Sequence, residues 1–221
     1  MTMFGTNPSN SSRRFLTRAR VAALAVSFAA TGVLAGTVPA QAATTRDTVA
    51  HHDGLQCRGK GVDSTAKIRY RTEILIKAPL STIWNLQTDV ARWPTWQEPV
   101  TSAKRLDPGP FREHSRFRWT TPVPETPHTP ATTLVITSTV GQLRHQACIR
   151  WTGPAIGEGL RIDRGVHVWT FTKVRGGVLV RTEETHAGEQ IETDVPLATE
   201  FLGQGLEAWL KALKETAEAR A

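Results

Sequence analysis

Cysteine is scarce in this sequence, and the motifs of most enzyme classes are missing. Two cysteines in 221 residues, without CxxC spacing, exclude a disulfide-dense scaffold and give no sign of a zinc site. The sequence also lacks a glycine-rich phosphate loop and a recognisable nucleophile motif. Because 39% of the residues are hydrophobic and only 21% are charged, the chain does not belong to the disordered class. These absences leave an ordinary folded domain.

Acidic residues are absent from positions 1–42, although the whole chain has 20 of them. The same stretch carries Arg13 and Arg14, an apolar run over 21–38 and the small-residue string AQA at 40–42. This order is typical of an export signal that is removed from the mature protein. We therefore predict a signal peptide over 1–42 and a protein exported across a bacterial cytoplasmic membrane, either secreted or kept in the cell envelope.

The export route is open on the sequence alone. The string SRRFL at 12–16 resembles the twin-arginine signal, but one residue is missing between the arginines and the Phe-Leu pair, so the general secretory route is equally compatible. The apolar run is short for a membrane span and is diluted by small and polar residues. An uncleaved anchor is the less favoured alternative, and we expect no stable membrane insertion after the signal is removed.

Positive charge is concentrated in the leader. The chain has 27 Lys and Arg against 20 Asp and Glu, and four of those arginines lie in the first 42 residues. Residues 43–221 therefore carry 23 basic and 20 acidic side chains. This near balance removes the electrostatic reason for a nucleic-acid partner.

The two cysteines lie on either side of the expected domain boundary. Residues 43–65 are polar and aperiodic, and we predict a flexible arm there. Cys57 lies in this arm and Cys148 lies in the domain, and an exported protein could join them in a disulfide. Two independent thiols are the alternative, and neither cysteine is assigned a catalytic or metal-binding role.

The hydrophobic pattern of the remaining sequence is typical of β-strands followed by one long C-terminal helix. Apolar and polar residues alternate in seven runs, which predicts strands near 66–76, 100–107, 114–121, 131–141, 144–152, 160–174 and 178–188. Two short helices are expected after Pro79 and Asp89, and the stretch 122–130 with its four prolines is expected to be a stiff loop. An apolar stripe predicts a long helix over 196–219. The fold class is α+β.

Two short segments resemble a known family. Residues 76–84 (IKAPLSTIW) and 89–96 (DVARWPTW) are similar to the opening signature of the START-like (SRPBCC) superfamily, polyketide cyclase/dehydrase-like branch. The resemblance implies a helix-grip domain over 66–219, in which a curved seven-stranded antiparallel sheet wraps around the long C-terminal helix. That superfamily contains lipid carriers, small-molecule receptors and aromatase/cyclases, so it implies a ligand cavity without deciding the function.

The last hairpin indicates which residues line such a cavity. A turn at Gly176-Gly177 would pair Arg175 with Val178, and counting outward then places His167 opposite His186, Trp169 opposite Glu184 and Phe171 opposite Thr182. All six side chains lie on one face, because side chains alternate along a strand. By the same alternation, Phe117 and Trp119 point inward from one strand, and Ile149 and Trp151 point inward from another. With two helix residues added, the predicted ligand-binding residues are Phe117, Trp119, Ile149, Trp151, His167, Trp169, Phe171, Thr182, Glu184, His186, Phe201 and Trp209.

Three functions fit this face. The favoured hypothesis is an exported, non-enzymatic protein that binds a hydrophobic or aromatic small molecule, with no cofactor and no metal. The alternative is a cyclase- or dehydratase-like enzyme in which His167 and Glu184 move protons. In the third, the cavity is filled by its own side chains and His167 and Glu184 are a structural pair. The sequence indicates neither the ligand nor the oligomeric state.

Overall fold

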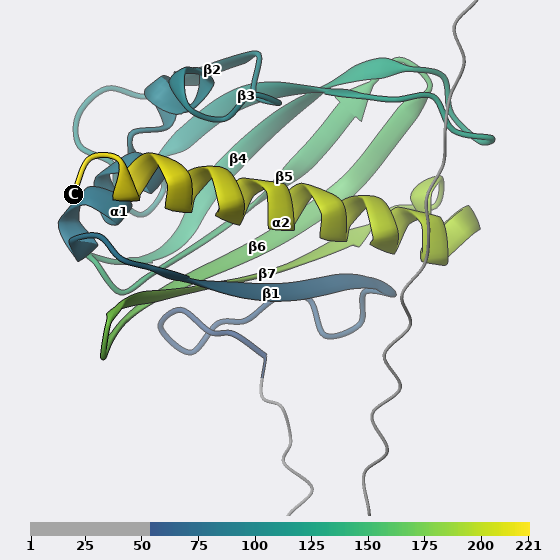
Figure 1. Cartoon of the computed structure of the whole chain (residues 1–221). Coiled ribbons are helices and arrows are strands. Elements are labelled where there is room, and N and C mark those ends of the chain that lie inside the picture. Colours follow the sequence, from purple (N-terminus) through teal and green to yellow (C-terminus); the bar gives the residue numbers. More distant parts are fainter. Residues whose placement is uncertain (1–53) are drawn as a thin grey trace, which may run out of the picture. The chain divides into compact units, whose positions relative to one another are not determined.

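The computed structural model describes residues 54–221, and the predicted signal peptide lies outside them. The chain folds into seven strands and two α-helices, with a short 3₁₀ helix before β2 and another before the last α-helix (Figure 1). The elements are β1 (Ile68–Ile76), α1 (Leu80–Thr88), η1 (Val90–Thr95), β2 (Ser102–Arg105), β3 (Arg116–Val123), β4 (Thr132–Arg144), β5 (Cys148–Gly157), β6 (Leu160–Val174), β7 (Gly177–Ala187), η2 (Ile191–Asp194) and α2 (Val195–Glu218).

All seven strands form one antiparallel sheet in the order β1-β7-β6-β5-β4-β3-β2. The helix α2 lies across one face of this curved sheet, and its C-terminal end reaches α1 (Figure 1). The predicted helix-grip architecture is therefore confirmed, with the long helix within a residue of its expected ends. In the described part of the chain, no helix is both long and apolar enough to span a membrane.

The helix α2 has a defined start and a close contact with the sheet. The Asp194 side chain accepts a hydrogen bond of 3.0 Å from the backbone N–H of Leu197, and a proline occupies the first turn. A Cβ atom on Gly203 would lie 2.7–2.9 Å from the ring of Tyr70, so this glycine allows β1 and α2 to approach each other. Gly205 faces open space, so a close approach of this kind explains Gly203 and not Gly205.

The β6–β7 hairpin corrects the predicted register. Val174 pairs with Gly177, so Arg175 and Gly176 form the turn and every partner moves by two residues. Gly176 has φ +89° and serves the turn, whereas a Cβ atom on Gly177 would collide with the carbonyl oxygen of Ile76 on β1. The second glycine is therefore needed by the neighbouring strand, a contact the local sequence does not reveal. Because the shift is even, the predicted inner and outer faces are unchanged.

With the corrected register, different residues become partners. His167 lies opposite Glu184, Trp169 opposite Thr182, and Phe171 opposite Val180. The predicted partnerships of these three residues were wrong. The true register brings an imidazole and a carboxylate directly together across two central strands.

The proline-rich stretch 122–130 begins inside a strand. Pro122 pairs with Thr133 on β4, while β2 ends its pairing with β3 at Thr120. Pro122 thus lies where β3 is an edge strand, and its missing N–H removes no sheet hydrogen bond on that side. The connection to β4 is correspondingly shorter than expected.

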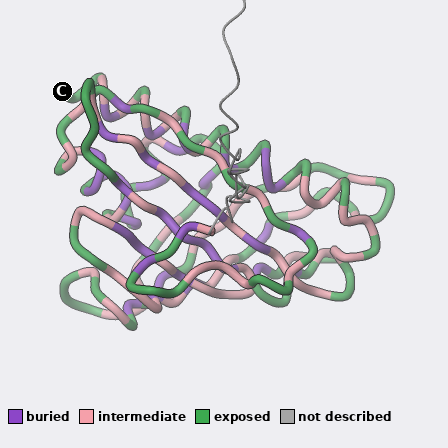
Figure 2. Tube along the Cα trace, turned by 90° about the horizontal axis from the view of Figure 1, so that it is seen from below, coloured by how far each residue is buried: buried purple, intermediate pink, exposed green. Residues whose placement is uncertain are grey.

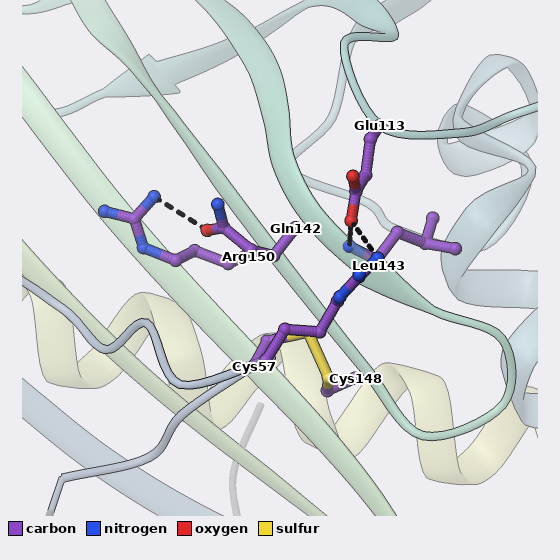
Figure 3. The surroundings of a disulfide bond; sticks show 7 residues. Cys57, Glu113, Gln142, Leu143, Cys148 and Arg150 are labelled. Atoms are coloured by element: carbon purple, nitrogen blue, oxygen red, sulfur yellow. Dashed lines mark hydrogen bonds and ion pairs between the residues drawn. A yellow bond between two sulfur atoms is a disulfide. The ribbon is translucent and has the colours of Figure 1, made fainter.

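Residues 54–65 pack on the outer face of the sheet. Cys57 forms a disulfide with Cys148 on β5, with the two Cα atoms 5.4 Å apart (Figure 3). Leu55 and Cys57 are buried against Val168, and the backbone N–H of Leu55 donates a 2.6 Å hydrogen bond to the buried carboxylate of Glu183. This part of the chain differs from the flexible arm expected over 43–65, because the disulfide and the buried contacts fix it.

The main core lies between the sheet and the C-terminal half of α2. Buried positions run along the strands and alternate with less buried ones (Figure 2). One large apolar cluster joins α1, η1, the inner face of the central strands and Leu210, Leu213 and Ala217 of α2. The N-terminal half of α2 contacts smaller, separate clusters. The two halves of the helix therefore meet different surroundings.

Candidate ligand-binding site

The predicted aromatic face exists and forms the wall of the main core. Six of the predicted residues belong to the large apolar cluster or pack against it from the strands: Phe117, Trp119, Ile149, Trp151, Trp169 and Phe171. Trp209 contacts the same cluster from α2, with its ring centroid 5.6 Å from that of Trp119 and 6.3 Å from that of Trp169. The inward orientation inferred from strand alternation is therefore correct for these strand residues.

Trp93 is the centre of this aromatic wall. Its ring lies 4.9–6.1 Å, centroid to centroid, from the rings of Phe117, Trp119, Trp151 and Trp209. The family motif marks Trp93 as a packing residue, and its full burial agrees with that role. At this end of the domain the interior is filled by the protein's own rings.

Several indole N–H groups in this wall lack partners. The N–H of Trp209 donates to the side-chain oxygen of Gln87 at 3.1 Å. By contrast, those of Trp96, Trp119 and Trp169 are buried and have no hydrogen-bond partner among residues 54–221. An unpaired buried donor is costly, so these groups are the ones a bound molecule or an ordered water would satisfy. No sequence pattern pointed to Gln87, a buried amide that links α1 to α2.

The polar residues of the same face form one chain of close contacts. His167 Nδ1 lies 3.1 Å from Glu184 Oε2, and His167 Nε2 lies 2.6 Å from the hydroxyl of Thr182. The other carboxylate oxygen of Glu184 lies 3.2 Å from Nε2 of His186. Thr182, His167, Glu184 and His186 are therefore linked in that order across β6 and β7.

Burial sets the protonation of this chain. Removal of His167 from water lowers its pKa to about 4, against the opposing attraction of Glu184. His167 is therefore neutral near pH 7, with Nε2 hydrogen-bonded to the hydroxyl of Thr182 and Nδ1 in close contact with Glu184. Burial alone would raise the pKa of Glu184, but its contacts with the two histidines outweigh burial and lower it. Glu184 stays ionised and accepts a hydrogen bond from His186.

The polar chain opens toward solvent at one end. The His167 side chain is 8% exposed, whereas those of Glu184 and His186 are 18% and 19% exposed although they lie on the face covered by α2. Aromatic rings enclose the inner end, since the His167 ring lies 5.1 Å from Trp151 and 4.8 Å from Trp169. The arrangement joins a dry aromatic wall to a partly open group of hydrogen-bond acceptors.

Two paired glycines lie beside this opening. Gly153 on β5 faces Gly165 on β6, and Gly165 faces His186 on β7. On either side are separate apolar clusters, one containing Ile68 and Leu202 and the other containing Leu134, Ala155 and Ile162. Gly165 leaves the floor next to Glu184 and His186 without a side chain, whereas the side-chain position of Gly153 is taken by the backbone carbonyl of Thr137 on β4.

One predicted ligand-binding residue lies outside this arrangement. Phe201 is 39% exposed and belongs to none of the apolar clusters on the inner face. Its helical spacing placed it at the margin of the apolar stripe, and α2 turns that margin toward solvent. Leu202, the next residue, makes the expected contact instead. Phe201 therefore lies apart from the aromatic wall and the polar chain.

One hollow on the described surface lies away from this face. A groove of about 260 Å³ runs beside α1 and η1 and is lined by Thr82, Asn85, Leu86, Asp89, Arg92, Thr95, Trp96 and Arg220. None of the predicted ligand-binding residues lines it. Within residues 54–221, no group of three or more histidine, cysteine, aspartate and glutamate side chains is arranged to hold a metal ion. The chemistry-bearing residues are therefore those of the polar chain under α2.

Comparison with known families covers the whole described domain. Residues 67–218 match the family described as polyketide cyclase / dehydrase and lipid transport. No curated protein matches the sequence.

Solved structures share the fold at low sequence identity. A START superfamily protein from Mycobacterium smegmatis is 14% identical, covers 69% of this chain and 99% of its own length, and has a TM-score of 0.55. A protein from Thermus thermophilus is 19% identical with the same coverage and a TM-score of 0.54. A protein from Helicobacter pylori is 14% identical, covers 74% of this chain and 99% of its own, and has a TM-score of 0.52. These similarities concern the fold alone.

Proposed function

Because the chain belongs to the polyketide cyclase / dehydrase and lipid transport family, we propose that it is an exported protein that holds a hydrophobic or aromatic small molecule between the sheet and α2. The observation that carries this proposal is the partial exposure of Glu184 and His186 next to His167, whose buried ring packs on that of Trp169. Side chains on a covered face are exposed only where the covering helix leaves space. An aromatic wall with a few polar groups at one end suits an apolar molecule with one polar end.

Native mass spectrometry tests the proposal directly. The full chain is purified from the cells that export it, and its mass is compared before and after denaturing extraction. We expect one apolar molecule per chain in the extract. A protein that is empty, and that also fails to bind an added apolar fluorophore, would contradict the proposal and favour a cavity filled by its own side chains.

The enzymatic alternative has one observation in its favour, the hydroxyl–imidazole–carboxylate chain formed by Thr182, His167 and Glu184. Both ring nitrogens of His167 are occupied within this chain, however, and Thr182 is fully buried. Replacing His167 with Gln separates the two functions. A binding protein should retain its affinity for an apolar ligand, whereas an enzyme should lose turnover by about 10²–10⁴-fold.

Export is part of the same proposal. The leader over 1–42 supports it, since its arginines, apolar run and AQA string have the order of a cleaved signal. The mass of the protein recovered outside the cytoplasm tests it, because removal of residues 1–42 gives a chain that begins at Ala43. An exported protein with an intact N-terminus would favour the membrane-anchor alternative.

A further inference from the structure

One ring nitrogen of the polar chain is unused. His167 has partners on both nitrogens, and each carboxylate oxygen of Glu184 has one histidine. His186 contacts Glu184 through Nε2 alone, and its Nδ1 has no hydrogen-bond partner within the part of the chain that the structure describes. Because an ionised carboxylate only accepts, Nε2 of His186 must carry the hydrogen. In the neutral ring, Nδ1 is then a free acceptor.

From this arrangement we infer that Nδ1 of His186 is the atom that recognises the ligand, and that the ligand is an aromatic or apolar molecule bearing a hydroxyl group, such as a phenol or an alcohol. This inference rests on the proposed function and assigns its polar contact. Glu184 fixes the ring and its tautomer, as a carboxylate does behind many functional histidines. Glu184 is therefore a positioning residue, and His167 supports it from the buried side.

The charges at this site select against one common class of apolar ligand. The partly exposed polar side chains here are those of Glu184 and His186, and the Nε2–H of His186 is already donated to Glu184. A ligand carboxylate, as in a fatty acid, would meet acceptors and a like charge. The site thus favours a neutral hydroxyl group over a carboxylate on the same apolar body.

Gly165 leaves space beside the pair formed by Glu184 and His186. A Cβ atom on Gly165 would lie 3.5 Å from a Glu184 carboxylate oxygen and 3.6 Å from Cδ2 of the His186 ring, within ordinary contact and without collision. Its backbone does not adopt a positive φ, so alanine is compatible with the fold at this position. A methyl group there would occupy space that a ligand next to this pair would need.

Three matched probes test the ligand class. The full-length protein, with its disulfide formed, is titrated with naphthalene, 2-naphthol and 2-naphthoate at about pH 8, where a free imidazole is neutral. Binding is followed by quenching of the tryptophan fluorescence and by calorimetry. We expect 2-naphthol to bind about tenfold more tightly than naphthalene, the effect of one hydrogen bond, and 2-naphthoate to bind more weakly than either.

Two variants with matched controls locate the effect. His186→Gln keeps a side-chain N–H for Glu184 and removes the ring acceptor, so it should lose the preference for 2-naphthol while naphthalene binds as before. His145→Gln makes the same change at an exposed histidine that packs on Trp84, outside the polar chain, and should leave the preference for 2-naphthol measured by calorimetry unchanged. Gly165→Ala should weaken both probes by about tenfold, whereas Gly205→Ala, which faces open space, should leave binding unchanged. Near-ultraviolet circular dichroism verifies that each variant is folded.

The outcomes separate this inference from the proposed function. If naphthalene and 2-naphthol bind the unmodified protein equally, or if 2-naphthoate binds most tightly, the protein binds apolar molecules but the assignment of His186 is refuted. If no probe binds, the proposed function fails and this inference fails with it. If His186→Gln does not fold, the comparison of the three probes on the unmodified protein still decides.

Discussion

Removing the disulfide should cost this domain a large part of its stability. Cys57 and Cys148 are 91 residues apart in sequence, and their bond closes a loop that contains β1 to β4. In the chain-entropy model such a closure stabilises the folded state by about 4–5 kcal/mol at room temperature, because the unfolded chain loses that conformational freedom. We expect Cys57→Ala/Cys148→Ala to lose about that free energy of unfolding.

Equilibrium unfolding in urea measures the effect. The full chain and the double variant are compared under oxidising conditions, and the midpoint should fall while the m-value rises, since the unlinked chain exposes more surface. The melting temperature should drop by about 10 °C or more for a domain of this size. Hydrogen exchange gives a local readout, because the N–H of Leu55 is held against Glu183 only while the adjoining segment is docked.

A small effect would refute the reasoning. If the double variant unfolds within about 1 kcal/mol of the unmodified protein, closure of the loop does not stabilise the fold as the model requires. Treating the unmodified protein with reductant is the matched control, since it should reproduce the loss without changing the buried side chains.

Three other changes test separate features of the structure. The pKa of His167 is lowered to about 4 from an ordinary 6.5, so the unfolded chain binds a proton that the folded chain does not. The free energy of unfolding should therefore decrease by about 3 kcal/mol as the pH falls from 6.5 to 4. In His167→Gln, the free energy of unfolding measured in urea should depend less steeply on pH. Glu183→Gln should cost about 1–3 kcal/mol, because Glu183 is a buried carboxylate, whereas Glu73→Gln, in an exposed ion pair, should cost less than about 1 kcal/mol. Gly203→Ala should lower the melting temperature because its methyl group meets an aromatic ring, whereas Gly205→Ala should raise it slightly.

The sequence predicts the faces of this sheet better than it predicts the pairing. Alternation placed His167, Trp169 and Phe171 on the inner face, and that assignment survived a register error because the error was an even number of residues. The pairing itself depended on Gly177, whose need for space comes from β1, about 100 residues earlier in the chain. A contact of that kind cannot be read from the local pattern of a hairpin.

The same limit explains why Phe201 on α2 and residues 54–65 differ from what the sequence pattern predicts. The period of α2 made Phe201 a neighbour of Leu202 on the apolar stripe, but the width of the stripe that is covered depends on how the sheet curves beneath the helix. Residues 54–65 have the composition of a loop, and a disulfide and one buried carboxylate, Glu183, hold them in place. Loop composition describes local preference, and long-range bonds override it.

The two halves of α2 indicate how stability and binding coexist in one small domain. At its C-terminal half the helix covers interlocking tryptophan rings, and residues such as Trp93 and Leu213 there are fully buried. At its N-terminal half the clusters are separate, glycine replaces side chains on the floor, and Glu184 and His186 keep partial exposure. A tightly packed end can supply the free energy that an open polar end lacks. Substitutions that enlarge or fill the N-terminal half should therefore change binding more than stability, and those in the tryptophan cluster should do the reverse.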